Sequence, residues 1–331
     1  MRRLIILHQG ALGDFLLTIP VLEGIYQCQP DLFMDFWSRR EHVALIASRP
    51  WVHTASSCEG PELLPFFHDD LWPEAPLPPF FQDAHAMVVF GQARSRILAG
   101  RLSHRVPYPV NWIQSFPDAA EQPRAVSRFL REQFVALGWP VKEVSVHIEP
   151  SHEERAAARA FLSFHGWSPK QKPVLLHPGS GGRRKIWPLR NWWSLLHWLR
   201  SHHDGPILLS RGPADEALEG FATEAAGRLG ILCLEDLPLN RLSAFLSECR
   251  FYMGNDSGVS HLAAATGIPC LIVFGPTNPS VWAPRGGHVH LFQTQWDPTD
   301  NLAWSPLASL EPLDPLLVRN LEKLLMHTAN G

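Results

Sequence analysis

Short apolar runs, which in the second half of the chain each open into a loop of small and polar residues, are the feature that most restricts how this chain can fold. Strands that are buried on both faces of a parallel sheet carry such runs without polar alternation. Helix-like stretches separate the runs, which predicts repeated βαβ units and an α/β fold. The runs are Leu4–Leu7, Leu32–Trp37, Met87–Phe90, Val174–Leu176, Ile207–Leu209, Phe251–Met253 and Leu271–Phe274.

Two α/β halves are expected, because the chain has 331 residues and a typical domain has about 150. The segment Ser151–Lys172 contains a helix-like stretch and then a polar, proline-containing connector. It is the candidate boundary between the two halves.

Charge and cysteine content argue against several classes of function. The chain carries 29 Lys and Arg against 32 Asp and Glu, so it offers no general attraction to nucleic acid. Its five cysteines are scattered and form no C-x-x-C pair, which argues against a disulfide framework and against a zinc site. No apolar stretch is long enough for a membrane-spanning helix. We expect a soluble, cytoplasmic protein with no metal site and no nucleic-acid partner.

Four loops of the second half are expected to line one site. Each follows a predicted strand, and the carboxyl ends of parallel strands lie at one edge of a sheet, where ligands bind. The loops comprise residues 177–182, 210–216, 254–258 and 275–277.

The first of these loops suits a diphosphate. Ser180 lies in a glycine-rich turn that precedes three cations, the last of which is Lys185. Glycines let backbone amides approach phosphate oxygens, and cations neutralise charge on a leaving group. The G-x-x-x-x-G-K-[ST] spacing of a Walker loop is absent. A flexible basic surface loop is the alternative interpretation.

The third loop precedes a short predicted helix, whose N-terminus would offer free N–H groups and a partial positive charge to a phosphate. Asp256, Ser257 and Gly258 stand at that N-terminus, and His261 in the first turn could reach the ligand. In the alternative interpretation, Asp256 or Ser257 only caps the helix and His261 packs in the core.

The N-terminal segment places a carboxylate, Asp14, after the first predicted strand. A dinucleotide-binding fingerprint would need a glycine where His8 stands, so the match to that motif is weak. Asp14 is a candidate general base. A role as a helix cap is the alternative.

Arginines accumulate between residues 94 and 131, where seven of them stand against two acidic residues. An anionic acceptor could dock on this surplus, and a solvated helix face is the alternative. The candidate acceptor-binding residues are Arg94, Arg96, Arg101 and Arg105.

Several of these groups recur together in one order along the chain. They are Gly10-Ala11-Leu12-Gly13-Asp14 with Thr18-Ile19-Pro20, His177-Pro178-Gly179 with Lys185 and Trp187-Pro188, Gly212-Pro213-Ala214-Asp215-Glu216, and Gly254-Asn255-Asp256-Ser257-Gly258 with His261 and Phe274-Gly275-Pro276-Thr277. Together they resemble glycosyltransferase family 9, the lipopolysaccharide heptosyltransferase family. The resemblance covers the first thirty residues and most of residues 173–285.

The resemblance implies a GT-B architecture, in which two Rossmann-like domains with parallel sheets face an interdomain cleft. Residues 1–160 would form the acceptor-side domain with the catalytic base, and residues 161–311 would form the domain that binds the nucleotide-sugar donor. A final helix within residues 312–331 would pack back on the first domain.

The same resemblance implies inverting, metal-independent transfer without a cofactor. The donor would be ADP-heptose or a related nucleotide-sugar, and the acceptor an anionic glycolipid similar to the lipopolysaccharide core. The enzyme would be cytoplasmic, with peripheral contact at the inner face of the cytoplasmic membrane.

Each site residue takes a role from the resemblance. Asp14 would deprotonate the acceptor hydroxyl, Asp256 would contact the sugar or orient its loop, and Asp215 or Glu216 would lie near the nucleoside. The diphosphate would be held by Gly13, Ser180, Lys185, Ser257, Gly258 and His261. Two other functions stay open: a non-catalytic sugar-nucleotide-binding relative that does not use Asp14, and an NAD(P)-dependent oxidoreductase with Arg39 and Arg40 near a 2′-phosphate.

Overall fold

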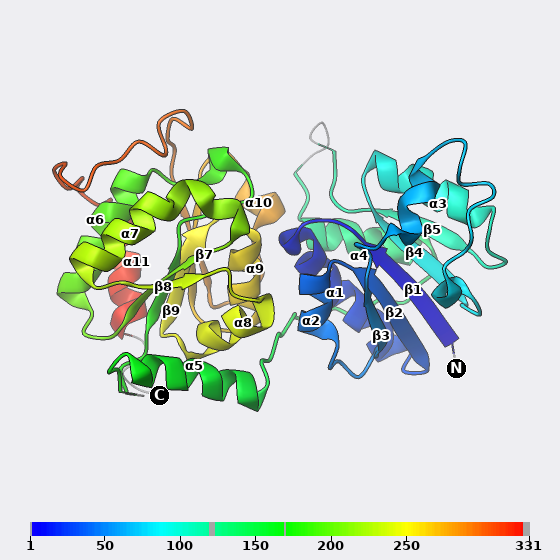
Figure 1. Ribbon diagram of the computed structural model, residues 1–331, viewed down its shortest axis with the longest axis horizontal. Coiled ribbons are helices and arrows are strands. Elements are labelled where there is room, and N and C mark those ends of the chain that lie inside the picture. Colours follow the sequence, from blue (N-terminus) through cyan, green and yellow to red (C-terminus); the bar gives the residue numbers. More distant parts are fainter. Residues whose placement is uncertain (1, 119–122, 169, 327–331) are drawn as a thin grey trace. The chain divides into compact units, whose positions relative to one another are not determined.

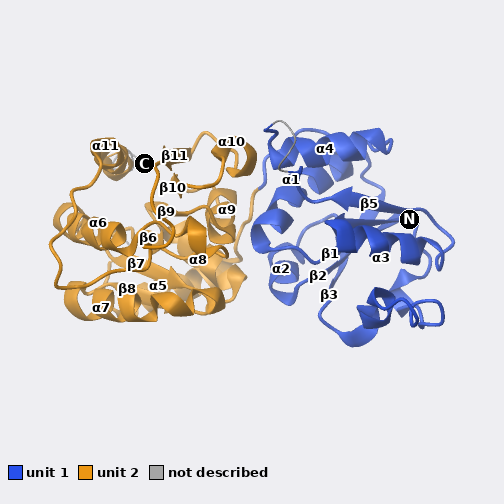
Figure 2. Cartoon of the chain, turned by 90° about the horizontal axis from the view of Figure 1, so that it is seen from above, with its two compact units in different colours: residues 1–146 blue, residues 147–331 orange. Residues whose placement is uncertain are grey.

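A computed structural model describes residues 2–118, 123–168 and 170–326 of the chain. The chain divides into two compact units, Met1–Val146 and His147–Gly331 (Figure 2). Sequence analysis placed the boundary after residue 160, but helix α5 (His152–Phe164) belongs wholly to the second unit. The physical reason is its packing against α8 (Leu239–Glu248), where Arg159 Nη1 lies 2.9 Å from Glu248 Oε1.

The described part of the first unit contains a five-stranded parallel sheet with strand order β3-β2-β1-β4-β5 (Figure 1). β1 lies in the middle, with Leu4 opposite Met34 of β2 and Ala86 of β4. The strands are β1 (Arg2–His8), β2 (Leu32–Ser38), β3 (Val52–Ser57), β4 (Ala86–Gly91) and β5 (Val110–Gln114). The helices are α1 (Leu12–Cys28), α2 (Arg40–Ile46), α3 (Ala93–Ser103) and α4 (Val126–Ala136).

The described part of the second unit contains a six-stranded parallel sheet with strand order β11-β10-β9-β6-β7-β8 (Figure 2). The strands are β6 (Val174–His177), β7 (Ile207–Arg211), β8 (Leu232–Glu235), β9 (Phe251–Asn255), β10 (Cys270–Phe274) and β11 (Val289–Gln293). Besides α5 and α8, the helices are α6 (Leu189–His202), α7 (Glu219–Leu229), α9 (Gly258–Ala265), α10 (Pro279–Trp282) and α11 (Pro315–Met326). All seven apolar runs lie within strands, so the predicted α/β class with parallel sheets is confirmed.

In each sheet, the direction in which successive strands are added changes once. In the second sheet the chain runs outward from β6 to β8 and then adds β9, β10 and β11 on the other side of β6. In the first sheet the same reversal separates β1 from β4. Open α/β sheets bind ligands at this switch point, outside the carboxyl ends of the strands. The loops after β6 and β9, and those after β1 and β4, are therefore the places to search for a site.

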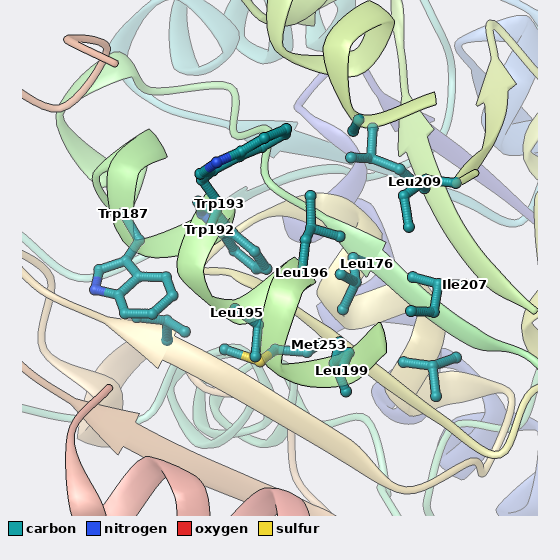
Figure 3. Packing of buried hydrophobic residues seen from close by; sticks show 14 of the residues in the cluster. Leu176, Trp187, Trp192, Trp193, Leu195, Leu196, Leu199, Ile207, Leu209 and Met253 are labelled. Carbon is teal, nitrogen blue, oxygen red and sulfur yellow. The ribbon is translucent and has the colours of Figure 1, made fainter. Parts of the chain in front are cut away.

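The core of the second unit is formed by its sheet and the helices packed on it. Buried strand residues such as Leu176, Leu209 and Met253 pack with Trp192 and Leu196 of α6 (Figure 3). Among the described residues, no helix has both the length and the apolar character needed to cross a membrane.

The last helix, α11, packs on the second unit rather than on the first domain, where sequence analysis placed it. Leu317, Leu321 and Leu324 form one buried stripe of α11 and belong to the core cluster of the second unit. Arg250 precedes β9, and its Nη1 donates a 2.7 Å hydrogen bond to the carbonyl of Leu325. Residues 327–331 of the predicted segment lie outside the described residues.

Candidate active site

The loops after β6 and β9 are tied together at the switch point of the second sheet. Asn255, at the end of β9, is fully buried; its side chain donates to the carbonyl of Pro178 and accepts from the backbone N–H of Trp187 at 3.1 Å. The hydroxyl of Ser180 donates a 2.9 Å hydrogen bond to the carbonyl of Asp256. Sequence analysis left Asn255 out of the site, although a polar residue directly after a buried strand was the available signal. These bonds fix the geometry of both loops.

An ion pair joins the same two loops. Nζ of Lys185 lies 3.2 Å from Oδ2 of Asp256, and the Asp256 side chain is buried while that of Lys185 is about one-third exposed. The hydroxyl of Thr277, in the loop after β10, donates to the same carboxylate oxygen at 2.8 Å. The structure therefore brings together two of the predicted site residues, Lys185 and Asp256, and adds Thr277, which was not among them.

The N-terminus of α9 lies beside this pair. Ser257 is the N-cap residue of α9, and its hydroxyl accepts from the backbone N–H of Ser260 at 3.3 Å. Gly258, half-buried, is the first residue of the helix. The predicted capping role of Ser257 is confirmed, and it leaves other N–H groups of the first turn directed out of the helix. With the helix dipole, they favour an anion at this end.

His261 lies in the first two turns of α9 and is buried. Burial, assisted by the Lys185 ammonium and opposed by the Asp256 carboxylate, lowers the pKa of His261 to about 4. The ring is therefore neutral near pH 7 and acts as a hydrogen-bonding group rather than as a cation. Lys185 and the helix N-terminus supply the positive charge of this site.

Asp215 and Glu216, the predicted nucleoside-binding pair, are placed differently from each other. Asp215 is buried; its carboxylate accepts from the backbone N–H of Gly212 at 2.9 Å and lies 3.9 Å from Nε2 of His177. Burial lowers the pKa of His177 while Asp215 opposes the shift. Asp215 thus holds its own loop, whereas Glu216 is exposed and free to meet a ligand.

Asp14 lies at the switch point of the first sheet. It is half-buried in the first turn of α1, next to Gly13, and Ala11 rather than Asp14 is the N-cap residue. A carboxylate in this turn interacts favourably with the helix dipole. Its side chain lies over Gly10, because a Cβ on Gly10 would lie 3.3 Å from Oδ2 of Asp14 and 2.9 Å from Cε1 of His8. Burial lowers the pKa of His8 to about 3, so the neighbouring ring is neutral near pH 7.

The four predicted acceptor-binding arginines fall into two groups. Arg94 and Arg96 are exposed at the start of α3, which follows β4, and Arg96 lies 5.3 Å from the ring centre of Trp112. Arg101 and Arg105 instead donate to backbone carbonyls of the proline-rich segment 61–79, at Phe66 and Ala75 respectively, both at 2.8 Å. The second pair therefore holds this segment in place, and only the first pair is available to a ligand at the switch point.

The arrangement in the second unit can hold a diphosphate. A cation, a helix N-terminus and a neutral buried histidine lie together at one sheet edge. Within the described ranges, no group of three or more His, Cys, Asp or Glu side chains is placed to hold a metal ion.

Comparisons with known proteins give consistent matches. A sequence model of glycosyltransferase family 9 (heptosyltransferase) matches residues 85–302, more than half of the chain. Lipopolysaccharide heptosyltransferase 1 of Salmonella typhimurium is 26% identical over 320 residues, covering 91% of this chain and 96% of the relative. The family match begins after the segment that contains Asp14.

Two solved structures share the fold. A family 9 glycosyl transferase from Veillonella parvula aligns with a TM-score of 0.76 and 17% identity, covering 99% of this chain and 98% of the other. The ADP-heptose lipopolysaccharide heptosyltransferase II of E. coli aligns with a TM-score of 0.71 and 17% identity, covering 99% of each chain.

Proposed function

The chain belongs to glycosyltransferase family 9, the heptosyltransferases, and from this premise we propose that it moves a heptose or a related sugar from ADP-heptose to a lipopolysaccharide-core-like acceptor. The Salmonella relative, a lipopolysaccharide heptosyltransferase, supports the acceptor class. The E. coli ADP-heptose heptosyltransferase II supports the donor. These matches favour a glycosyltransferase over the oxidoreductase and over a non-catalytic relative.

The observation that carries the proposal is the pairing of Lys185 with Asp256 beside the N-terminus of α9. Sugar transfer leaves a nucleoside diphosphate, whose negative charge grows as the glycosidic bond breaks. Lys185 and the α9 N-terminus stabilise that charge, and Ser257, Gly258 and neutral His261 hydrogen-bond the phosphate oxygens. With these groups present, the transfer needs no metal ion.

Asp14 would supply the other half of the chemistry. Its carboxylate takes the proton of the acceptor hydroxyl, and the oxygen attacks the anomeric carbon as the bond to the diphosphate breaks. The bonding electrons leave with the nucleoside diphosphate, and a single displacement of this kind inverts the anomeric centre. Gly13 leaves room beside Asp14 in the same turn, and exposed Arg94 and Arg96 would meet anionic groups of the acceptor.

The acceptor would be a glycolipid at the inner face of the cytoplasmic membrane. We assign the enzyme to the cytoplasm, with peripheral contact at that membrane through its acceptor. Glu216, exposed next to the donor loops, would reach the nucleoside.

Calorimetric binding of ADP, UDP, GDP and NADP to the purified protein, with a chelator present, tests the donor side. We expect ADP to bind selectively and Lys185→Ala to weaken its binding by about 10-fold or more, as for the loss of a charged hydrogen bond. Preferential binding of UDP or GDP would show that ADP-heptose is not the donor. NADP binding alone would overturn the proposal.

Asp14→Asn tests the acceptor side, with exposed Asp31→Asn as the matched control. Loss of a general base lowers turnover by about 10²- to 10⁴-fold, and ADP binding should be unchanged. Turnover that survives in Asp14→Asn would remove Asp14 from the mechanism. Addition and removal of divalent metals, including iron, should leave the wild-type rate unchanged.

A further inference from the structure

We propose that Trp296 is a positioning residue of the donor site, and that its indole sets the relative placement of the two loops that hold the Asp256 carboxylate. Sequence analysis assigned none of the tryptophans to the site. The inference rests on the proposed function, in which the Asp256 carboxylate and Lys185 form part of the diphosphate site.

The first contact of Trp296 is with the loop after β10. Its ring lies so close to Gly275 that a Cβ on Gly275 would lie 2.2 Å from Cη2 of the indole. No side chain fits at that distance, so the glycine is needed for the ring to lie there. Two residues further on, Thr277 donates to Oδ2 of Asp256 at 2.8 Å.

The second contact of Trp296 is with the loop after β6. Its indole Nε1 donates a 3.2 Å hydrogen bond to the carbonyl of Arg184. Arg184 is the middle residue of a short 3-10 turn, Arg183–Lys185, and the next side chain is that of Lys185. The same turn is held by fully buried Asn301, whose side-chain amide donates to the carbonyls of Arg183 and Ile186.

The two loops meet at one atom. Lys185 reaches Oδ2 of Asp256 from one side at 3.2 Å, and Thr277 reaches it from the other at 2.8 Å. Trp296 bridges the backbones that carry these two side chains. A shift of the indole therefore changes where the ammonium and the hydroxyl lie, which alters diphosphate binding more than folding, since Trp296 is only partly buried at the margin of the core.

The chain provides a control for a purely structural effect. Trp304 follows Trp296 in the same segment, but its ring packs on Trp193 and Phe221, with centroids 5.2 and 5.1 Å away. Trp304→Phe should therefore lower stability and leave the affinity for ADP unchanged.

The experiment is a double-mutant cycle on Gly275 and Trp296, read out as ADP affinity, donor KM and kcat, with thermal unfolding measured in parallel. Gly275→Ala pushes the indole out of place, so we expect ADP affinity to fall and donor KM to rise by about 3- to 10-fold, the range of one hydrogen bond. In a Trp296→Ala background the added methyl group has space, and the same substitution should cost about nothing. Trp296→Phe keeps a ring over Gly275 and loses only the bond to Arg184, so its effect should be intermediate.

Two outcomes overturn the inference. One is Gly275→Ala with wild-type ADP affinity and donor KM; the other is an equal loss from Gly275→Ala in both backgrounds. If either outcome is found while the wild-type protein binds ADP and Lys185→Ala weakens that binding, only the role of Trp296 is disproved and the proposed function stands. A wild-type protein that binds no ADP would instead remove the proposed function.

Discussion

The ammonium of Lys185 lies 3.2 Å from Oδ2 of Asp256, so a cation that is suited to a diphosphate is paired with a carboxylate in the proposed donor site. An incoming diphosphate must compete with that carboxylate and is also repelled by it. When no nucleotide is bound, the charges of Lys185 and Asp256 therefore compensate each other. This compensation lowers the affinity for the nucleotide.

Asp256→Asn should raise the affinity for ADP and lower sugar transfer. Removing one like charge near the phosphates is worth about 1 kcal/mol, or about 5-fold in Kd, while the proposed contact of Asp256 with the sugar is lost. Calorimetry and a transfer assay measure the two effects. Thr277→Val, which removes a hydrogen bond to Asp256 without a change of charge, is the control and should not tighten ADP binding. An Asn variant that binds ADP as poorly as Lys185→Ala would contradict this account.

Gly179→Ala should destabilise the protein, because its Cβ would lie 2.1 Å from Oδ1 of buried Asp215. Overpacking of this kind costs about 1–3 kcal/mol in the free energy of unfolding. Gly181 lies in the same loop and has nothing within 4 Å of its added Cβ, so Gly181→Ala is the matched control and should change stability little. Denaturant unfolding measures both. Equal stability of the two variants would show that the Asp215 loop moves easily.

The interior strands of both sheets could be predicted from the sequence, and the edge strands could not. β1, β2 and β4 in the first sheet and β6, β7, β9 and β10 in the second are covered on both sides by other strands, and their apolar runs were recognised. In the edge strands β3, β5, β8 and β11, most residues are half-buried or exposed rather than buried. The sequence Val52–Ser57, for example, contains one strongly apolar residue and reads as a loop.

The site shows a similar division. Residues in the loops that follow buried strands, such as Lys185 and Asp256, could be found because the topology itself brings such loops together. Trp296 and Asn301 act on the Arg183–Lys185 turn from more than 110 residues away in sequence. They belong to an irregular segment, so no periodicity marked them. The placement of α11 was missed for a different reason: its leucine stripe predicts a buried face but not the partner that covers it.

Substitution of the α3 arginines should separate acceptor binding from stability. Arg94→Ala combined with Arg96→Ala should raise the KM for the acceptor with little change in unfolding, because both side chains are exposed. Arg101→Ala should lower stability by about 1–3 kcal/mol, since it leaves the carbonyl of Phe66 without its donor. Steady-state kinetics and denaturant unfolding test the two expectations. If Arg101→Ala changed the acceptor KM in a fully stable protein, the structural role assigned to it would be wrong.

Stability should fall as the pH is lowered from 7 to 5, and His42 should account for part of the loss. Its fully buried ring stacks on Phe15 with centroids 4.7 Å apart. Burial, assisted by Arg39, lowers its pKa to about 4, against 6.5 in the unfolded chain. Between these values the unfolded state binds the proton and the folded state does not, so the free energy of unfolding decreases as the pH falls through this window.

At pH 5 this single group should cost about 2 kcal/mol relative to pH 7 and above. His42→Leu removes the titrating group. The slope of its unfolding free energy against pH should therefore be smaller than that of the wild type, by an amount that corresponds to at most one bound proton. This expectation holds whatever the absolute stability of the variant. Exposed His290→Gln on β11 is the control and should keep the wild-type slope. Denaturant unfolding at half-unit pH steps gives the slopes directly. Identical slopes for His42→Leu and wild type would mean that the ring is protonated in the folded protein, which the buried contact with Phe15 opposes.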